Sequence, residues 1–351
     1  MRIKVDICFC QLLFYEVKNL DELANHIELT EEEKIQITEK LSLRITPYYL
    51  DLIKKYPVLR KTVVPTLNEF KISDGESLDP LKEEGYNPTK CIVHKYPDRC
   101  LLIATNFCST NCRYCTRSRI FDNENETSSI NRHDLEDAFQ YIRDHKELRD
   151  IIISGGDPLT MSTGNLEYIL QKIRAIEHIE IIRIGTKVPV VLPQRIDSKL
   201  VNMLKKYHPL YLSIHFTHVS EITPECKKSC EKLANAGIPL RSQTVLLKGV
   251  NDDVESIREL MQGLLKIRVM PYYLYSCDRI IGTEHFRVPI EKGIEIIKGL
   301  RGYTSGYAIP SFVVDSTEGK IIINPDNIIE NNDKEIILRA YNNKIVKFNK
   351  N

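Results

Sequence analysis

Short apolar segments alternate with amphipathic segments through the middle of the chain, from about residue 99 onward. The apolar segments are short and rich in β-branched residues, as expected for strands that are buried on both faces. The amphipathic segments place apolar residues three and four positions apart, which is the spacing of one helix face. One such set is Leu166, Ile169, Leu170 and Ile173. The alternation predicts a parallel sheet with crossover helices. The six predicted strands are CLLIAT, DIIIS, IEIIRIG, LYLSIHF, LRSQTVLL and VMPYYLYS.

Signals for helix ends agree with this order. Asn131 is a favourable N-cap for the segment RHDLEDAFQYI, and Gly237 and Gly302 stand where helices are expected to stop. Further helices are predicted to begin near Asp197, Pro224, Asp253 and Pro289. Six strand and helix units of about 35 residues each are fewer than the eight of a closed barrel. We therefore predict an α/β fold built on a partial (β/α)6 barrel.

The two ends of the chain have different patterns. From about residue 20 to 90 the pattern is helical and polar, with Thr30 and Glu33 at capping-box spacing before EEEKIQITEKL, and with turns expected at Pro47 and Pro65. The tail alternates again in KIIINPDNII, EIILRAY and KIVKF, with a hairpin turn at Asn342 and Asn343. We predict a helical N-terminal region over residues 1–92, the barrel over 93–318, and a C-terminal segment with a β hairpin over 319–351.

Composition narrows the class of protein. The chain has 351 residues, 42% of them hydrophobic, which is enough for a sizeable core. Its 49 Lys and Arg nearly balance its 48 Asp and Glu, so the charge offers no broad surface for a nucleic acid and favours a small-molecule substrate. No apolar run approaches the roughly 20 residues of a membrane-spanning helix. We predict a cytoplasmic protein without a membrane segment.

Three of the ten cysteines, Cys108, Cys112 and Cys115, stand in CSTNCRYC directly after the first predicted barrel strand. Three thiolates can bind three irons of a 4Fe-4S cluster and leave the fourth iron open. The amino and carboxylate groups of S-adenosylmethionine can chelate that open iron. The alternative is a structural zinc site completed by His94 or His133, but such sites usually contain a second cysteine pair. We interpret the remaining cysteines as structural.

Two glycines follow the second predicted strand, in the segment Ser154, Gly155, Gly156 and Asp157. Glycine lets the backbone come close to a ligand. Together with the cysteine pattern, this segment resembles the radical S-adenosylmethionine superfamily. The resemblance implies that Ser154, Gly155, Gly156 and Asp157 bind the methionine part of S-adenosylmethionine.

From about residue 21 to its end, the chain resembles the lysine 2,3-aminomutase family. The similarity is densest in HKYPDR, CRYCTR, ISGGDPL, RIGTKVPVVLPQRI, LLKGVND, PYYLYSCD, EHFR and TSGYAIPSFVVD. Enzymes of that family use an adenosyl radical and pyridoxal 5'-phosphate to move an amino group between adjacent carbons. The resemblance therefore implies an isomerase that interconverts L-lysine and L-β-lysine, with a 4Fe-4S cluster, S-adenosylmethionine and pyridoxal phosphate as cofactors.

The resemblance also implies roles for individual residues. Lys320 matches the lysine that holds pyridoxal phosphate as a Schiff base, although only STEG separates it from Asp315, a shorter loop than in the family. Two aspartates that converge would repel each other unless a cation lies between them. The family resemblance implies that the cofactor phosphate is bound by Lys95 and Arg99. It implies that the substrate carboxylate is bound by Arg117 and the substrate ammonium by Asp278 and Asp315. Further cofactor-binding residues that it implies are His215, Gln243 and Tyr275.

Other functions and partners stay open at this point. A guanidinium would also suit the two aspartates, so arginine is an alternative substrate. The chain could also be a radical enzyme without pyridoxal phosphate that acts on a peptide or tRNA, or a non-catalytic iron-sulfur or zinc protein. An electron donor such as flavodoxin or ferredoxin is expected, as is a homo-oligomer. We expect no structural zinc, because no cysteine follows Cys277 and the family's zinc-binding partner position is Asp253.

Overall fold

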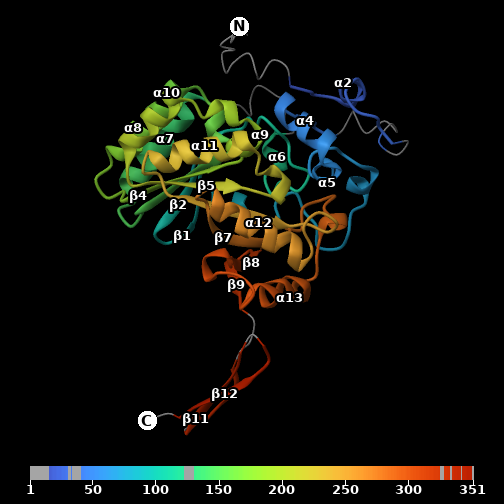
Figure 1. The fold of residues 1–351 in the computed structure, drawn as a ribbon. Coiled ribbons are helices and arrows are strands. Elements are labelled where there is room, and N and C mark those ends of the chain that lie inside the picture. The colour runs from blue at the N-terminus through green and yellow to red at the C-terminus, as the bar shows by residue number, and fades with distance from the viewer. Residues whose placement is uncertain are drawn as a thin grey trace.

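The computed structural model describes residues 16–30, 33, 41–121, 130–324, 328–332, 334–340 and 342–349. Within these ranges the chain forms one nine-stranded sheet wrapped by helices and a separate three-stranded sheet near the C-terminus (Figure 1). Most of the helix predicted over EEEKIQITEKL lies outside the described residues, as do Cys8 and Cys10.

The N-terminal part consists of short helices, as the sequence predicted. They are α2 (Leu20–Ala24), α4 (Pro47–Lys55), α5 (Pro57–Arg60) and the 3-10 turns η1 (Leu67–Phe70) and η2 (Glu83–Tyr86). The capping box is confirmed, since the Thr30 N–H donates to Glu33 Oε2 at 2.8 Å and the Glu33 N–H donates to Thr30 Oγ1 at 3.2 Å. Pro47 differs from the expected turn: it is the first residue of α4, a position where proline is tolerated because its N–H would have no helical partner.

The main sheet runs in chain order from β1 to β9. Strands β2 to β8 are parallel, and β1 and β9 pair antiparallel with them at the two edges. The six predicted strands are confirmed as β2 to β7. We did not predict the seventh parallel strand, β8, because its sequence SFVVDS has only three apolar residues. The bounds are β1 (Ile92–Tyr96), β2 (Arg99–Thr105), β3 (Asp150–Gly155), β4 (Ile181–Thr186), β5 (Leu210–His215), β6 (Leu240–Leu246), β7 (Met270–Ser276), β8 (Ser311–Ser316) and β9 (Gly319–Ile323).

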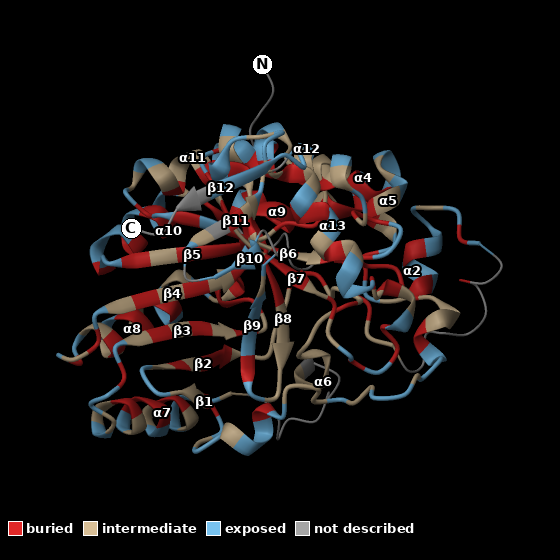
Figure 2. Cartoon of the chain, turned by 90° about the horizontal axis from the view of Figure 1, so that it is seen from below, coloured by how far each residue is buried: buried red, intermediate tan, exposed pale blue. Residues whose placement is uncertain are grey.

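Helices occupy the six connections between the parallel strands and cover the sheet from outside (Figure 2). The major ones are α7 (Arg132–Asp144), α8 (Thr163–Arg174), α10 (Ser198–Leu204), α11 (Pro224–Asn235), α12 (Val254–Lys266) and α13 (Ile290–Leu300), with short helices α6 (Ser118–Phe121) and α9 (Val188–Val191). The side chain of Asn131 caps α7 by accepting from two backbone N–H groups. The predicted partial (β/α)6 barrel is confirmed.

One continuous hydrophobic core includes residues from Val17 to Phe312. The N-terminal helices, the sheet and the crossover helices therefore share buried contacts, and the division of the chain at residues 92 and 318 stays a prediction. None of the helices in the described part is long and apolar enough to span a membrane.

The two edge hairpins of the sheet meet, although more than 200 residues separate them. Lys95 Nζ in β1 donates to the carbonyl oxygen of Ser316 in β8 at 2.7 Å. The backbone N–H of Lys320 in β9 donates to the hydroxyl of Tyr96 at 2.9 Å. These contacts bring the HKYPDR segment beside Lys320.

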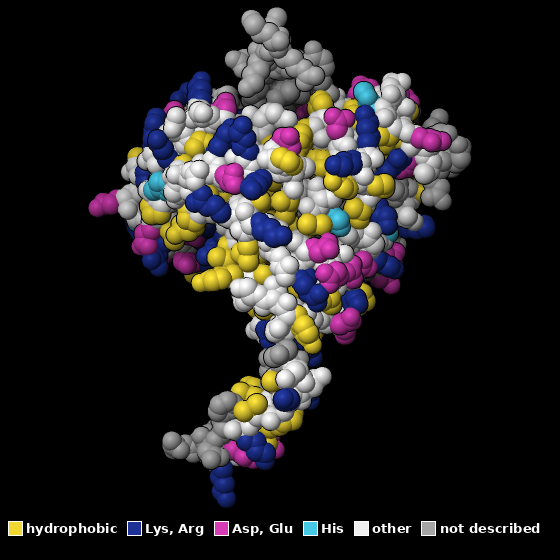
Figure 3. Space-filling model, viewed as in Figure 1, with side chains coloured by type: hydrophobic (Ala, Val, Ile, Leu, Met, Phe, Trp, Pro, Cys, Tyr) yellow, Lys and Arg dark blue, Asp and Glu magenta, His cyan; other side chains and the backbone are white. Residues whose placement is uncertain are grey.

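The C-terminal sheet extends away from the barrel (Figures 1 and 3). It contains β10 (Ile328–Asn331), β11 (Glu335–Arg339) and β12 (Ile345–Asn349). The hairpin turn predicted at Asn342 and Asn343 is confirmed between β11 and β12, and Asn343 has a φ of 62°. Hydrophobic side chains of this extension are exposed, among them Ile328, Ile329, Ile345 and Val346.

Candidate active site

Two adjoining cavities lie inside the barrel, and the predicted site residues line one or both of them. The cysteine cavity, of about 160 Å³, is lined by Cys108, Cys112, Cys115, Ser154, Gly155, Gly156 and Asp157. The lysine cavity, of about 240 Å³, is lined by Lys95, Arg99, Gln243, Tyr275, Asp278, Asp315 and Lys320. Arg117, Ser154 and His215 line both cavities. The fold thus gathers residues from every parallel strand around one continuous space.

The three cysteines lie on the loop after β2, and the N-terminal region holds this loop in place. Arg44 donates to the carbonyl oxygen of Cys108 at 3.4 Å, and its guanidinium lies 4.3 Å from the ring centroid of Phe107. Burial raises the pKa of the Cys108 and Cys112 thiols, and Lys187 beside Cys112 opposes that rise. The thiols are buried groups that a bound cation would favour as thiolates.

The donor set fits a cluster better than a single ion. Across the described ranges, no three His, Cys, Asp or Glu side chains converge as ligands of one metal ion. The thiolates of a 4Fe-4S cluster bind three different irons, so they need to face one cavity without meeting at one point. Cys108, Cys112 and Cys115 meet this requirement, since none of them forms a disulfide and all three line the cysteine cavity.

The two histidines considered for a zinc site lie elsewhere. His94 Nδ1 is 2.7 Å from the hydroxyl of Tyr141, and His133 Nδ1 is 3.2 Å from Asp137 in an exposed pair on α7. Neither histidine is among the residues that line the cysteine cavity. The geometry therefore favours the cluster over a zinc site completed by either of them.

The glycine turn after β3 packs against the backbone that precedes the cysteines. Gly155 has a φ of 113°, and a Cβ on Gly156 would lie 2.1 Å from the carbonyl oxygen of Phe107. The Gly156 N–H donates to the Thr105 carbonyl oxygen at 2.6 Å. The close approach that requires glycine here is thus to the chain's own backbone, and it sets where the cysteine loop begins.

Asp157 directs its carboxylate into the protein. It accepts from Thr186 Oγ1 at 2.7 Å and from the Lys187 N–H at 2.6 Å, and two further backbone N–H groups donate to it. Burial raises the pKa of Asp157, although these hydrogen bonds oppose the rise. Asp157 therefore ties the loop after β3 to the loop after β4 at the wall of the cysteine cavity.

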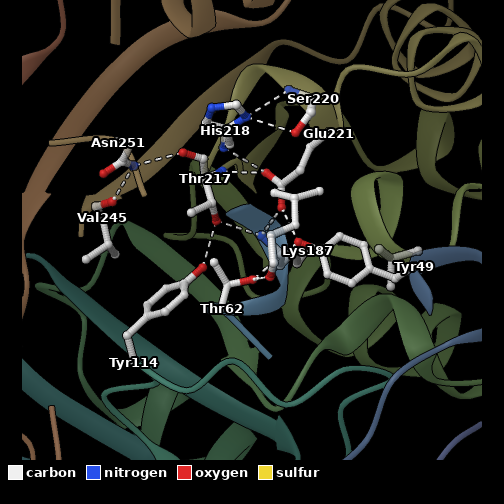
Figure 4. Close-up of polar contacts among 12 residues, drawn as sticks. Tyr49, Thr62, Tyr114, Lys187, Thr217, His218, Ser220, Glu221, Val245 and Asn251 are labelled. Atoms are coloured by element: carbon white, nitrogen blue, oxygen red, sulfur yellow. Dashed lines mark hydrogen bonds and ion pairs between the residues drawn. The ribbon is translucent and has the colours of Figure 1, made fainter. Parts of the chain in front are cut away.

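Lys187, which the sequence analysis missed, lies at the centre of a buried polar network beside the cysteine cavity (Figure 4). Its Nζ is 2.9 Å from Glu221 Oε1 and donates to Thr217 Oγ1 at 3.0 Å. Tyr49 donates to the same Glu221 oxygen at 2.7 Å, and Tyr114 OH is 2.8 Å from Thr217 Oγ1. Burial alone would lower the pKa of Lys187, but Glu221 together with Tyr114, Tyr49 and Cys112 outweighs burial and holds that pKa above its usual value.

Removing the countercharge from this network is expected to destabilise the fold. Glu221→Gln should lower the free energy of unfolding by roughly 3–5 kcal/mol, because it leaves a buried ammonium without a carboxylate. Anaerobic urea unfolding measures the change. Glu180→Gln, which breaks the exposed pair with Arg149, should leave stability nearly unchanged. Equal changes in the two variants would contradict this assignment.

Lys320 faces Asp315 across the β8–β9 hairpin. The two residues are partners in the antiparallel register, and Lys320 Nζ lies 2.7 and 2.8 Å from the two carboxylate oxygens. The shortened segment before Lys320 forms a tight turn in which Ser316 pairs with Gly319, whose φ is 118°. Lys320 Nζ also lies 4.7 Å from the ring centroid of Tyr275. The short loop thus presents the amine to the lysine cavity.

A row of polar side chains continues from Tyr275 across neighbouring strands. Gln243 donates to Tyr275 OH at 3.3 Å, and His215 is the register partner of Gln243 on β5. Burial lowers the pKa of His215 to about 4, so this histidine is neutral at neutral pH. Uncharged groups that both donate and accept hydrogen bonds therefore line the lysine cavity, and one of them, His215, also lines the cysteine cavity.

The basic residues predicted to bind a phosphate lie near the meeting point of the edge hairpins. Arg99 stacks on Tyr96, with 3.9 Å from its guanidinium carbon to the ring centroid, and pairs with Asp98 at 2.8 Å. Arg183, which the sequence analysis missed, lines the same cavity and pairs with Asp150 at 2.9 Å. Arg183 is the register partner of Ile152 on β3, and its side chain reaches Asp150 two positions earlier; this contact has no local signal in the sequence.

The two aspartates face the same cavity from the ends of β7 and β8. Thr116 Oγ1 donates to Asp278 Oδ2 at 2.6 Å. Burial raises the pKa of Asp278 to about 6; Asp315 adds to the rise, and Lys320 and Arg117 oppose it. Asp278 and Asp315 also line an outer cavity of about 770 Å³.

Comparisons with known proteins give a consistent result. A sequence model of the radical SAM superfamily matches residues 102–261, and one described as lysine-2,3-aminomutase matches residues 297–350. The L-lysine 2,3-aminomutase of Fusobacterium nucleatum is 46% identical over 347 residues, which covers 95% of this chain and 81% of that protein. That of Clostridium subterminale is 47% identical over 341 residues, with the same coverage. A glutamate 2,3-aminomutase of Clostridioides difficile is 41% identical over 339 residues, covering 94% of this chain and 80% of that protein.

Proposed function

This chain belongs to the lysine 2,3-aminomutase family of radical S-adenosylmethionine enzymes, and we propose that it interconverts L-lysine and L-β-lysine by moving the amino group between carbons 2 and 3. The observation that carries the choice of substrate is the placement of Asp278 and Asp315 in one cavity with Lys320 and Arg117. A cationic side chain suits the aspartates, and a carboxylate suits the arginine.

The residues present fit the cofactors that the family uses. Cys108, Cys112 and Cys115 would hold the 4Fe-4S cluster, the loop from Ser154 to Asp157 and the polar row would border S-adenosylmethionine, and Lys320 would hold pyridoxal phosphate near Lys95, Arg99 and Arg183. When bound, these groups supply a carbon radical that abstracts hydrogen and an aldehyde that carries the migrating nitrogen.

The chain's own residues prepare Lys320 for covalent chemistry. Nζ must lose a proton before it can act as a nucleophile. Asp315 Oδ1, at 2.7 Å, stabilises the ammonium until another base removes that proton. Once Nζ is no longer charged, the Asp315 carboxylate has lost its cation. A substrate ammonium restores the balance, which is a physical reason to expect a cationic amino acid.

The product identifies the activity. Anaerobic protein incubated with L-lysine, S-adenosylmethionine, pyridoxal phosphate and a reductant should form β-lysine, detectable by chromatography and mass spectrometry. Complete return of unchanged lysine from cluster-loaded protein would refute the proposal.

Arginine is the second candidate because the two aspartates do not close off the site. Both also line the outer cavity, so a longer side chain has space beyond them. Side-by-side turnover of lysine and arginine separates the two. Glutamate, the substrate named for the Clostridioides difficile relative, would place a third carboxylate between Asp278 and Asp315. We therefore propose that glutamate is rejected.

The raised pKa of Asp278 predicts a pH dependence. Below about pH 6 Asp278 is protonated and loses its attraction for an ammonium. The kcat/KM for lysine should therefore fall roughly tenfold for each pH unit below 6. Asp278→Asn should lower kcat/KM and remove its fall below pH 6. The control Asp51→Asn, at an exposed residue, should keep the pH profile of the unmodified protein. A flat profile of the unmodified protein down to pH 5 would argue against the role of Asp278.

We also propose partners for the chain. An electron donor such as flavodoxin or ferredoxin would reduce the cluster, and a cytoplasmic location agrees with this need. The exposed isoleucines of the C-terminal sheet favour a homo-oligomer, because an isolated small sheet with exposed apolar residues is marginally stable. We expect that assembly to lack structural zinc, since Asp253 serves as the N-cap of α12.

A further inference from the structure

A buried glutamate holds Arg117, which lines both cavities. Glu83, on η2, is 5% exposed and lines the lysine cavity. Its Oε2 accepts from Arg117 Nε at 3.0 Å and its Oε1 from Arg117 Nη2 at 2.5 Å. The sequence analysis missed Glu83 because it lies in the N-terminal region, 34 residues before Arg117, in a segment without a distinctive pattern.

The contact uses one edge of the guanidinium and leaves another free. An arginine has five N–H donors in a fixed plane, and the bidentate contact with Glu83 takes one from Nε and one from Nη2. The donors of Nη1 and the second donor of Nη2 remain on the other edge. A ligand carboxylate can bind that edge while Glu83 keeps the first.

A second arginine keeps Glu83 from moving. Arg119 Nη2 lies 3.2 Å from Glu83 Oε2 and 3.3 Å from Asp79 Oδ1. Burial alone would raise the pKa of Glu83, but Arg117 and Arg119 outweigh it and hold that pKa below its usual value. Glu83 is therefore a charged support that two arginines hold.

We propose that Glu83 is the positioning residue for recognition of the substrate's α-carboxylate: it fixes the plane of Arg117 so that the free edge of the guanidinium faces the cavity. The inference rests on the proposed aminomutase function, in which Arg117 binds that carboxylate. It makes the N-terminal region a contributor to substrate affinity as well as to packing.

Two ligands that differ only in the carboxylate test the proposal. Dissociation constants of L-lysine and L-lysinamide are measured by calorimetry on the anaerobic holoenzyme, and kcat and KM for lysine are measured in parallel. Glu83→Gln should weaken lysine binding about ten- to a hundredfold, as loss of a group that orients a binding residue typically does. It should raise KM similarly, change kcat by less than about threefold, and leave lysinamide binding unchanged.

Matched variants exclude general damage. Glu84→Gln makes the same charge change at the exposed neighbouring residue, which pairs with Arg119 and not with Arg117. This variant should behave like the unmodified protein. Glu83→Asp keeps the charge with a shorter reach and should recover part of the lysine affinity. Equal weakening of lysine and lysinamide, or no weakening of lysine, would overturn the proposal. Unmodified protein that binds lysine but forms no β-lysine would instead count against the proposed function.

Discussion

Changing Cys108, Cys112 or Cys115 singly to alanine is expected to remove the iron-sulfur cluster and to lower turnover by more than about four orders of magnitude, because the cluster would supply the electron that generates the radical. Each thiolate would bind a different iron, so the remaining two cannot take over its place. No other cysteine in the described part of the chain lines the cysteine cavity.

Three measurements test this expectation under anaerobic conditions. They are iron and sulfide content, the electron paramagnetic resonance signal of the reduced protein, and cleavage of S-adenosylmethionine. Cys91→Ala is the matched control, because Cys91 is a buried thiol outside both cavities. It should keep its cluster. If a variant in which one of these three cysteines is replaced by alanine still cleaves S-adenosylmethionine, the assignment is wrong.

Lys320→Ala should lower aminomutase turnover by roughly three to four orders of magnitude while leaving the protein folded, because the side chain supplies a nucleophile that no neighbour replaces. Its side chain is 35% exposed, so its ion pair with Asp315 contributes little to stability. Lys320→Arg should be equally inactive, because arginine keeps the charge but cannot be deprotonated in a protein.

Chemical trapping locates the bond to the cofactor. Borohydride reduction of protein loaded with pyridoxal phosphate, followed by peptide mass spectrometry, should find the pyridoxyl group on Lys320. Lys347→Ala removes another lysine that pairs with a carboxylate in the C-terminal region, and it should leave labelling and turnover unchanged. A pyridoxyl group on a different lysine, or turnover by Lys320→Arg, would show that the assignment is wrong.

The three cluster cysteines and Lys320, whose replacement has the largest expected effects, differ in how far the sequence reveals them. The cysteines lie within eight consecutive residues, so their spacing alone indicates a shared ligand. Lys320 has no such local signal, because it was singled out by its likeness to a family. Its chemical setting depends on Asp315, Tyr96 and Tyr275, which three other strands supply.

The sequence alone determined the elements whose signals are local. Short apolar runs, separated by amphipathic segments, predicted β2 to β7. Each run is continuous because a strand that is buried on both faces needs apolar residues on both faces. Asn131 marked the start of α7, because a cap depends on residues within one turn. The sequence did not predict β8, because that strand lacks a local apolar signal. Its pairing with β7 makes it a strand, and its own composition does not.

Only the tertiary structure decided which distant residues meet. Glu83 reaches Arg117, Lys187 reaches Glu221, and the β1–β2 hairpin reaches Lys320 because the barrel and its N-terminal helices pack around one core. Such contacts depend on strand register and on the angle at which helices cover the sheet, and neither is encoded within a few neighbouring residues. The chemistry of the cysteines could therefore be read from the chain, whereas the shape and charge of the substrate cavity exist only once it is folded.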